Sequence, residues 1–87
     1  MEEIKQLIYD GRTGEAIKRL DSLIAVDPKA DEAYYLRGNA YRKEGDFPRA
    51  LNNYLIAMDL NPDSPAQHAH DMLLQILNFS DPNRFNH

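Results

Sequence analysis

The hydrophobic residues of this chain recur every three or four positions, a spacing that places them on one face of a helix. Between residues 47 and 60 the apolar side chains are Phe47, Ala50, Leu51, Tyr54, Ala57 and Met58. No segment alternates strictly between apolar and polar residues, as a half-buried strand would. The pattern predicts an all-α fold of about five helices, at about 2–10, 13–26, 31–44, 47–60 and 65–79.

The same pattern occurs twice along the chain. When the sequence is shifted by 34 residues, glycine, alanine and proline fall on residues of their own type. The three coincidences pair Gly11 with Gly45, Ala16 with Ala50 and Pro28 with Pro62. Apolar positions also match at this offset, and Leu20, for example, is paired with Tyr54. Self-similarity at this period indicates stacked pairs of helices.

Each repeated residue type has a mechanical role. Gly45 is expected to close one helix in the left-handed conformation, and Asp46 to cap the next helix. Ala50 is small enough to let the two helices of a pair approach closely. Proline has no amide hydrogen and disfavours the helical conformation in the residue before it, so Pro28 and Pro62 are expected to end the second and fourth helices.

Residues 31–62 resemble a tetratricopeptide repeat, whose pattern combines aromatic, small and proline residues. The matching positions here are Tyr34, Gly38, Tyr41, Ala50, Tyr54, Ala57 and Pro62. One position departs from the pattern, because Arg37 stands where the family usually has leucine, and Leu36 comes one residue earlier. The resemblance implies an α–α superhelix of stacked antiparallel helix hairpins.

The resemblance also implies how the chain is organised. Residues 1–87 are expected to form a single domain, because so short a chain cannot sustain two separate cores. Residues 1–28 resemble the same repeat with its first helix shortened and with Leu23 in place of a small residue. Residues 31–62 are the complete repeat, residues 65–79 a capping helix and residues 80–87 a tail.

The capping helix has signals of its own. Ser64 followed by Pro65 predicts the start of a helix, because serine caps helices and proline suits the first helical position. The stripe expected to face the preceding pair consists of Ala69, Met72, Leu73, Ile76 and Leu77. Phe79 and Phe85 are expected either to fold back onto helix ends or, for Phe85, to dock on a second copy or a partner.

In proteins of the resembled family, the first helix of each pair lines a concave groove that receives a peptide or a partner helix. The resemblance therefore implies a protein-binding groove formed by the first, third and fifth predicted helices. The residues expected to line it are Lys5, Tyr9, Glu32, Tyr35, Leu36, Asn39, Arg42, Lys43, His70 and Leu73, and Ile8, Ala66 and Ala69 would adjoin them. Asn39 would grip a peptide backbone with both its amide donor and its carbonyl acceptor.

The leading hypothesis is an adaptor or scaffold that binds a peptide or partner protein in this groove. The alternative is a self-associating structural scaffold, a homodimer or larger oligomer formed through the capping helix and tail. Some members of the family grip a chain-terminal carboxylate with lysine, asparagine and arginine residues on three helices. Asn39 matches one of them, but Ala66 and His70 stand where lysine and arginine are needed, so we expect no such recognition.

Composition narrows the choice of partner. Fourteen acidic and ten basic residues give a net charge of -4, which disfavours nucleic acid and anionic membrane surfaces. No stretch approaches the roughly 20 apolar residues that span a bilayer. The first residues lack the basic start and apolar run of a secretion signal, so a cytoplasmic protein is expected.

We expect neither enzymatic activity nor a cofactor or metal site. The sequence has no cysteine, its glycines match no phosphate-binding loop and its serines no nucleophile motif. His68 and His70 are two residues apart on a predicted helix, so they point in nearly opposite directions and cannot share a metal ion. Both are expected to face solvent.

Overall fold

The computed structural model describes residues 1–80, and the side chains of residues 1–78. Its five helices are α1 (Glu2–Tyr9), α2 (Thr13–Val26), α3 (Asp31–Glu44), α4 (Phe47–Leu60) and α5 (Ala66–Ser80). The described residues contain no strand, and the predicted all-α fold is confirmed. The predictions for Phe79, for Phe85 and for the tail after Ser80 lie outside the described residues and side chains.

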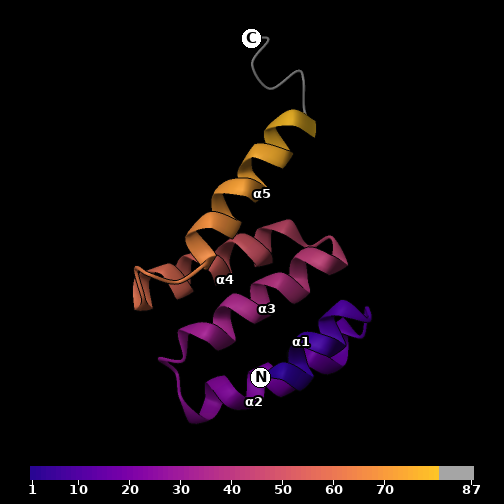
Figure 1. Cartoon of the computed structure of the whole chain (residues 1–87), viewed down its shortest axis with the longest axis vertical. Helices are drawn as coiled ribbons and strands as arrows, with labels where there is room; N and C mark the ends of the chain where they lie inside the picture. Colours follow the sequence, from indigo (N-terminus) through magenta and orange to yellow (C-terminus); the bar gives the residue numbers. More distant parts are fainter. Residues whose placement is uncertain (81–87) are drawn as a thin grey trace.

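The helices are arranged as two stacked hairpins followed by a single helix (Figure 1). The hairpin of α1 and α2 lies at one end of the molecule, and the hairpin of α3 and α4 lies beside it. Helix α3 contacts α1 and α2 as well as its own partner α4, whereas α5 packs on α4 at the opposite end. The first helices of the two hairpins therefore lie side by side.

The residues that the repeat pattern singles out have the expected backbone geometry. Gly11 and Gly45 end α1 and α3 in the left-handed conformation, with φ of 83° and 84°. The Asp46 carboxylate accepts a hydrogen bond of 3.2 Å from the amide of Arg49, which caps α4. Asp27 and Asn61, the residues before the two prolines, are extended. The glycines, the capping aspartate and the prolines thus set the helix boundaries.

The hydrophobic core consists of two clusters that meet at α3. The first joins α1, α2 and one side of α3, and its fully buried members are Ala16, Leu20, Ala33 and Ala40. The second joins α4, α5 and the other side of α3, and its fully buried members are Ala50, Tyr54, Ala57 and Ala66. Tyr35 packs against both clusters. Equivalent positions of the repeat, such as Leu20 and Tyr54, are both completely buried.

Gly38 is the point of closest approach between α3 and α4. A Cβ atom on Gly38 would lie 2.6 Å from Cε1 of Tyr54 and 3.2 Å from the carbonyl oxygen of Ala50. Any side chain here would therefore collide with a ring that has no room to move. Gly38 is therefore required because the Tyr54 ring occupies the space that a side chain at position 38 would need.

Arg37, the departure from the family pattern, joins three helices. Its Nε donates to Oδ1 of Asn53 on α4 at 2.7 Å, and its Nη1 pairs with Oδ1 of Asp21 on α2 at 2.8 Å. The guanidinium also lies over the ring of Tyr34, 5.3 Å from its centroid. Where leucine would supply only apolar contact, arginine supplies one polar link to the other hairpin, through Asp21, and one within its own hairpin, through Asn53.

The orientation of α5 differs in part from the prediction. Leu73 is buried, and Ala69 and Leu77 are half-buried against α4, as expected. Met72 and Ile76, however, are 47% and 49% exposed, so they do not belong to the packed face. That face includes Ala66 instead, which is completely buried. The start of α5 is as predicted, since the amide of Ala66 donates to Oγ of Ser64 at 3.1 Å.

Candidate functional site in the concave groove

A hollow of about 270 Å³ opens where α1, α3 and the turn before α5 meet. Its lining residues are Lys5 from α1, Asp31, Glu32 and Tyr35 from α3, and Ser64 and Pro65 from the turn. Three of the predicted groove residues, Lys5, Glu32 and Tyr35, thus come together in one depression although they lie far apart in sequence. We call this depression the groove pocket.

The charge of the groove pocket is set by a lysine held among carboxylates. The Lys5 ammonium lies 3.1 Å from Oε1 of Glu2 and 3.9 Å from Oε1 of Glu32. The hydrogen bond to Glu2 and the charges of both glutamates raise the pKa of Lys5. The Asp31 carboxylate adds a third negative charge to the site. The pocket therefore remains acidic despite its lysine.

Tyr35 forms a fixed aromatic wall of the pocket. Its side chain is half-buried and packs against both hydrophobic clusters. The centroid of its ring lies 6.1 Å from that of Tyr54, with the two planes tilted by 38°. A ring held in this way loses little further freedom when a ligand packs against it, which favours binding.

Asn39 and Arg42 lie one and two helical turns further along α3, next to the buried end of Tyr54. The Tyr54 hydroxyl donates to Oδ1 of Asn39 at 2.5 Å. Burial raises the pKa of Tyr54, and the nearby positive charge of Arg42 opposes this effect. One acceptor position of the Asn39 carbonyl is therefore already occupied by the Tyr54 hydroxyl.

Tyr9 and Lys43 contact each other at the far end of the groove. The Lys43 ammonium donates to the backbone carbonyl of Tyr9 at 2.9 Å and lies 5.7 Å from the centroid of its ring. This contact ties the end of α1 to the end of α3. The Tyr9 ring itself is 78% exposed and remains accessible.

The remaining predicted groove residues are placed differently. Leu36 and Leu73 are 3% and 2% exposed, and Ile8 is also buried, so all three belong to the core. Sequence spacing could not distinguish these apolar positions from groove positions, because both lie on the same helices. His70 is half-buried, with Nδ1 3.2 Å from Oδ1 of Asp71, whereas His68 is exposed. The expectation that both histidines face solvent is wrong for His70.

Sequence reasoning missed Asp31 as a lining residue and assigned Ser64 only a capping role. Asp31 accepts a hydrogen bond of 3.1 Å from Nδ2 of Asn61, which fixes its carboxylate beside the pocket. Ser64 caps α5 as predicted and also lines the pocket. Neither residue lies in the helical stripe that indicated the groove, so their participation depends on how the turns fold.

Comparison with known proteins agrees with this architecture. The sequence profile of the tetratricopeptide repeat matches residues 2–66, well over half of the chain. The chain belongs to the tetratricopeptide repeat family. Repeats of this family generally mediate interactions between proteins. Within the described residues, no helix is both long and apolar enough to cross a membrane.

Two curated proteins and one solved structure show the similarity in detail. Superkiller complex protein 3 of Mus musculus is 33% identical over 54 residues, and tetratricopeptide repeat protein 37 of Xenopus laevis is 32% identical over the same length. These stretches cover 62% of this chain but only 4% of either relative. A Bacteroides fragilis protein solved by solution NMR is 49% identical, with a TM-score of 0.87. The match covers 98% of this chain and 87% of that one.

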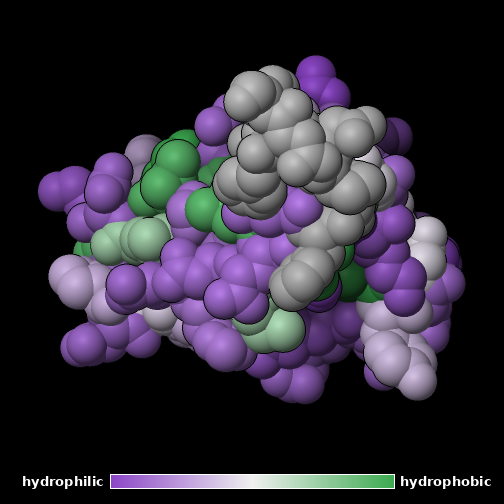
Figure 2. Space-filling view, turned by 90° about the horizontal axis from the view of Figure 1, so that it is seen from above, coloured by the Kyte–Doolittle hydropathy of each residue, from purple (hydrophilic) through white to green (hydrophobic). Residues whose placement is uncertain are grey.

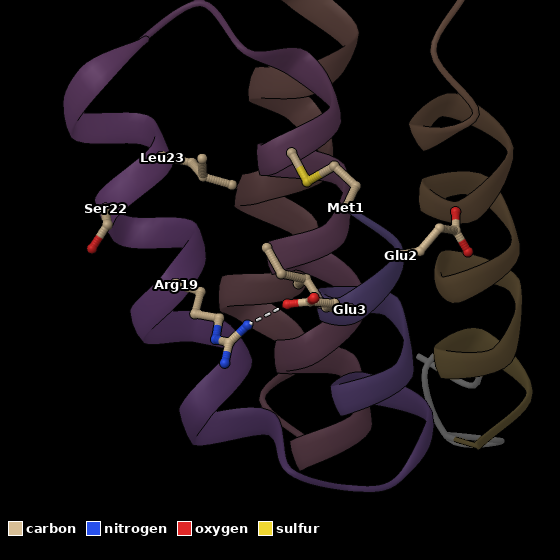
Figure 3. A pocket seen from close by; sticks show the side chains of 7 residues that line it. Met1, Glu2, Glu3, Arg19, Ser22 and Leu23 are labelled. Atoms are coloured by element: carbon tan, nitrogen blue, oxygen red, sulfur yellow. Dashed lines mark hydrogen bonds and ion pairs between the residues drawn. The ribbon is translucent and has the colours of Figure 1, made fainter.

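A second hollow lies between α1 and α2. Helix α1 has 8 residues and α3 has 14. Leu23 on α2 is 39% exposed, whereas its equivalent Ala57 on α4 is completely buried. This hollow has a volume of about 570 Å³. Figure 3 shows Met1 and Leu23 on one side of it and the ion pair of Arg19 and Glu3 on the other.

Proposed function

We propose that this protein is a non-enzymatic interaction module that binds a segment of another protein in the groove of α1, α3 and the start of α5. The single observation that carries the proposal is the groove pocket, where α1, α3 and the turn before α5 meet at the half-buried ring of Tyr35. An aromatic wall surrounded by exposed charged side chains is typical of surfaces that bind polypeptides. Membership of the tetratricopeptide repeat family supports the same role.

The test begins with a displayed library of random peptides selected on the purified protein. Binding of the selected peptides is measured by calorimetry on a groove variant that combines Glu32→Ala, Tyr35→Leu and Arg42→Ala. Leucine keeps apolar volume at position 35, and Asn39 is left unchanged because it holds the Tyr54 hydroxyl. We expect binding to weaken at least tenfold, about 1.4 kcal/mol, because the aromatic wall and both flanking charges are lost.

The matched control changes one base and one acid away from the groove. Lys18→Ala on α2 and Asp59→Ala on α4 both alter exposed side chains, and neither residue lines the groove pocket. This variant should bind the selected peptides as the unchanged protein does. Equal binding by the groove variant and the control, with both folded by circular dichroism, would exclude the groove as the binding site.

A second candidate function is self-association through α5. It is favoured by the exposed Met72, Leu74 and Ile76 on that helix, and by Leu55 on the neighbouring helix α4. Seen from the α5 end, areas of hydrophobic surface lie among hydrophilic residues (Figure 2). Light scattering decides between the candidates, since a monomer at high micromolar concentration excludes the scaffold and a defined oligomer supports it.

A further inference from the structure

The two ends of the groove carry opposite charge. At the pocket end, the carboxylates of Asp31 and Glu32 and that of Glu2 outnumber the single ammonium of Lys5. At the other end, Arg42 and Lys43 lie in the last turn of α3. Among the described residues, no carboxylate lies within ion-pair distance of either side chain. The groove is thus negative where α3 begins and positive where it ends.

This polarity distinguishes α3 from the other helices described. It alone has acidic residues in its first turn together with basic residues in its last turn. Such charges also stabilise a helix by opposing its dipole, but that effect requires no contact with a pocket. Here the acidic turn lines the groove pocket, and Arg42 lies beside the Asn39 and Tyr54 pair.

The pocket end has the chemistry that recognises a cation. A guanidinium or ammonium group entering the pocket would meet the carboxylates of Asp31 and Glu32 and could lie against the ring of Tyr35. Carboxylates pair with cations, and aromatic faces attract them. Lys5 already offsets part of this charge, since its ammonium lies 3.1 Å from Oε1 of Glu2 and 3.9 Å from Oε1 of Glu32, so an entering cation would share Glu32 with it. The hollow of about 270 Å³ can hold the end of one long side chain.

At the other end, most of the polar groups already have a partner, including the Glu44 carboxylate, which accepts from the Thr13 hydroxyl at 2.8 Å. The carbonyl of Asn39 is engaged by Tyr54, and the Lys43 ammonium is held by the carbonyl of Tyr9. Arg42 is exposed, and its guanidinium provides the accessible positive charge at this end of the groove. Arg42 therefore suits an acidic side chain of a partner.

The helical rise fixes the distance between the two ends. Ten residues separate Glu32 from Arg42, and at 1.5 Å per residue the two positions lie about 15 Å apart along α3. An extended polypeptide advances about 3.3 Å per residue, so it covers this distance in about four to five residues.

We propose that the groove takes an extended protein segment with a lysine or arginine side chain in the groove pocket and an acidic side chain about four to five residues away, at Arg42. This inference rests on the proposed function and names the partner's chemistry.

The experiment uses a displayed peptide library in which one arginine and one glutamate are fixed. Their separation varies from two to eight residues in both orders, and the other positions are random. On the unchanged protein, we expect enrichment of one order at a separation of four to five. The charge-reversed variant Glu32→Arg/Arg42→Glu has the same net charge and should enrich the opposite order. The control Lys18→Glu/Asp59→Arg reverses two exposed charges outside the groove and should select as the unchanged protein does.

A milder variant keeps the test decisive if charge reversal prevents folding. Glu32→Gln removes one carboxylate of the pocket and should weaken binding of a selected arginine peptide about threefold to fivefold, in the range of single exposed charge pairs. The same loss is not expected for that peptide with citrulline in place of arginine.

Each outcome has a separate meaning. Peptides that depend on the groove but show no preferred order or separation would overturn this inference and leave the groove proposal intact. A preference that survives charge reversal would also overturn it. If no peptide depends on the groove, both proposals are wrong.

Discussion

At the scale of single residues, Gly38 and Tyr54 decide how closely the two helices of the complete repeat can pack. Gly38→Ala places a methyl group 2.6 Å from the fixed ring of Tyr54. Relief of this overlap should cost more than alanine gains as a helix former, so we predict a net loss of about 1–2 kcal/mol in the free energy of unfolding. Urea denaturation measures the loss.

Gly14 provides the control for that substitution. It lies in α2, and a Cβ atom there would meet nothing within 4 Å. Gly14→Ala should therefore leave stability unchanged or raise it by up to about 1 kcal/mol. A loss of equal size at both positions would mean that the contact with Tyr54 is not the cause.

The Tyr54 hydroxyl makes stability depend on alkaline pH. Burial raises its pKa in the folded protein, so the unfolded chain releases this proton at lower pH than the folded chain does. The stabilisation is complete below the ordinary tyrosine pKa of about 10 and is lost as pH rises through the folded value. Urea unfolding at pH 8 to 11 should show a steeper decline for the unchanged protein than for Tyr54→Phe.

The control for that measurement is Tyr9→Phe, which removes a hydroxyl from a ring that is 78% exposed. It should keep the steep decline of the unchanged protein. Parallel curves for the unchanged protein and Tyr54→Phe would show that the buried hydroxyl does not control alkaline stability.

Residue roles within the helical stripe could be predicted only in part. The family resemblance implies Lys5, Glu32 and Tyr35 as groove residues, and these three line one pocket. Leu36 satisfies the same spacing but faces the core, because α3 has neighbours on two sides. The bond between Tyr54 and Asn39 joins α4 to α3, and no pattern within either helix indicates it.

At the scale of helices, the boundaries were predictable because the signals that set them are local. Gly45, Asp46 and Pro62 act on their immediate neighbours, and the structure confirms each role. The rotation of α5 was not predictable in this way. Its sequence offers more apolar residues than one face can bury, and the surface of α4 selects among them.

The packed face of α5 can be tested by truncating residues on either side of it. Leu73 is 2% exposed, so Leu73→Ala should reduce the free energy of unfolding by about 2–4 kcal/mol through lost burial and the cavity left behind. Met72→Ala removes a neighbouring side chain that is 47% exposed and should cost less than about 1 kcal/mol. Thermal or urea denaturation measures both, and equal costs would contradict the orientation.

At the scale of the whole molecule, the stacking of two hairpins creates a surface that neither hairpin has alone. The repeat in the sequence was sufficient to predict this stacking. The acidic pocket at one end could not be predicted, because it requires the turn before α5 to bring Ser64 and Pro65 beside Asp31. Its shape follows from tertiary contacts between residues about 30 positions apart.

The central claim is that another polypeptide lies in the groove of α1 and α3, beside the start of α5. Nuclear Overhauser contacts between a selected unlabelled peptide and the isotope-labelled protein test it most directly. We expect contacts from the peptide to the Tyr35 ring and to the side chains of Lys5 and Arg42. Contacts confined instead to Leu55 and Ile56 on the outer face of α4, with none to Tyr35, would contradict the account.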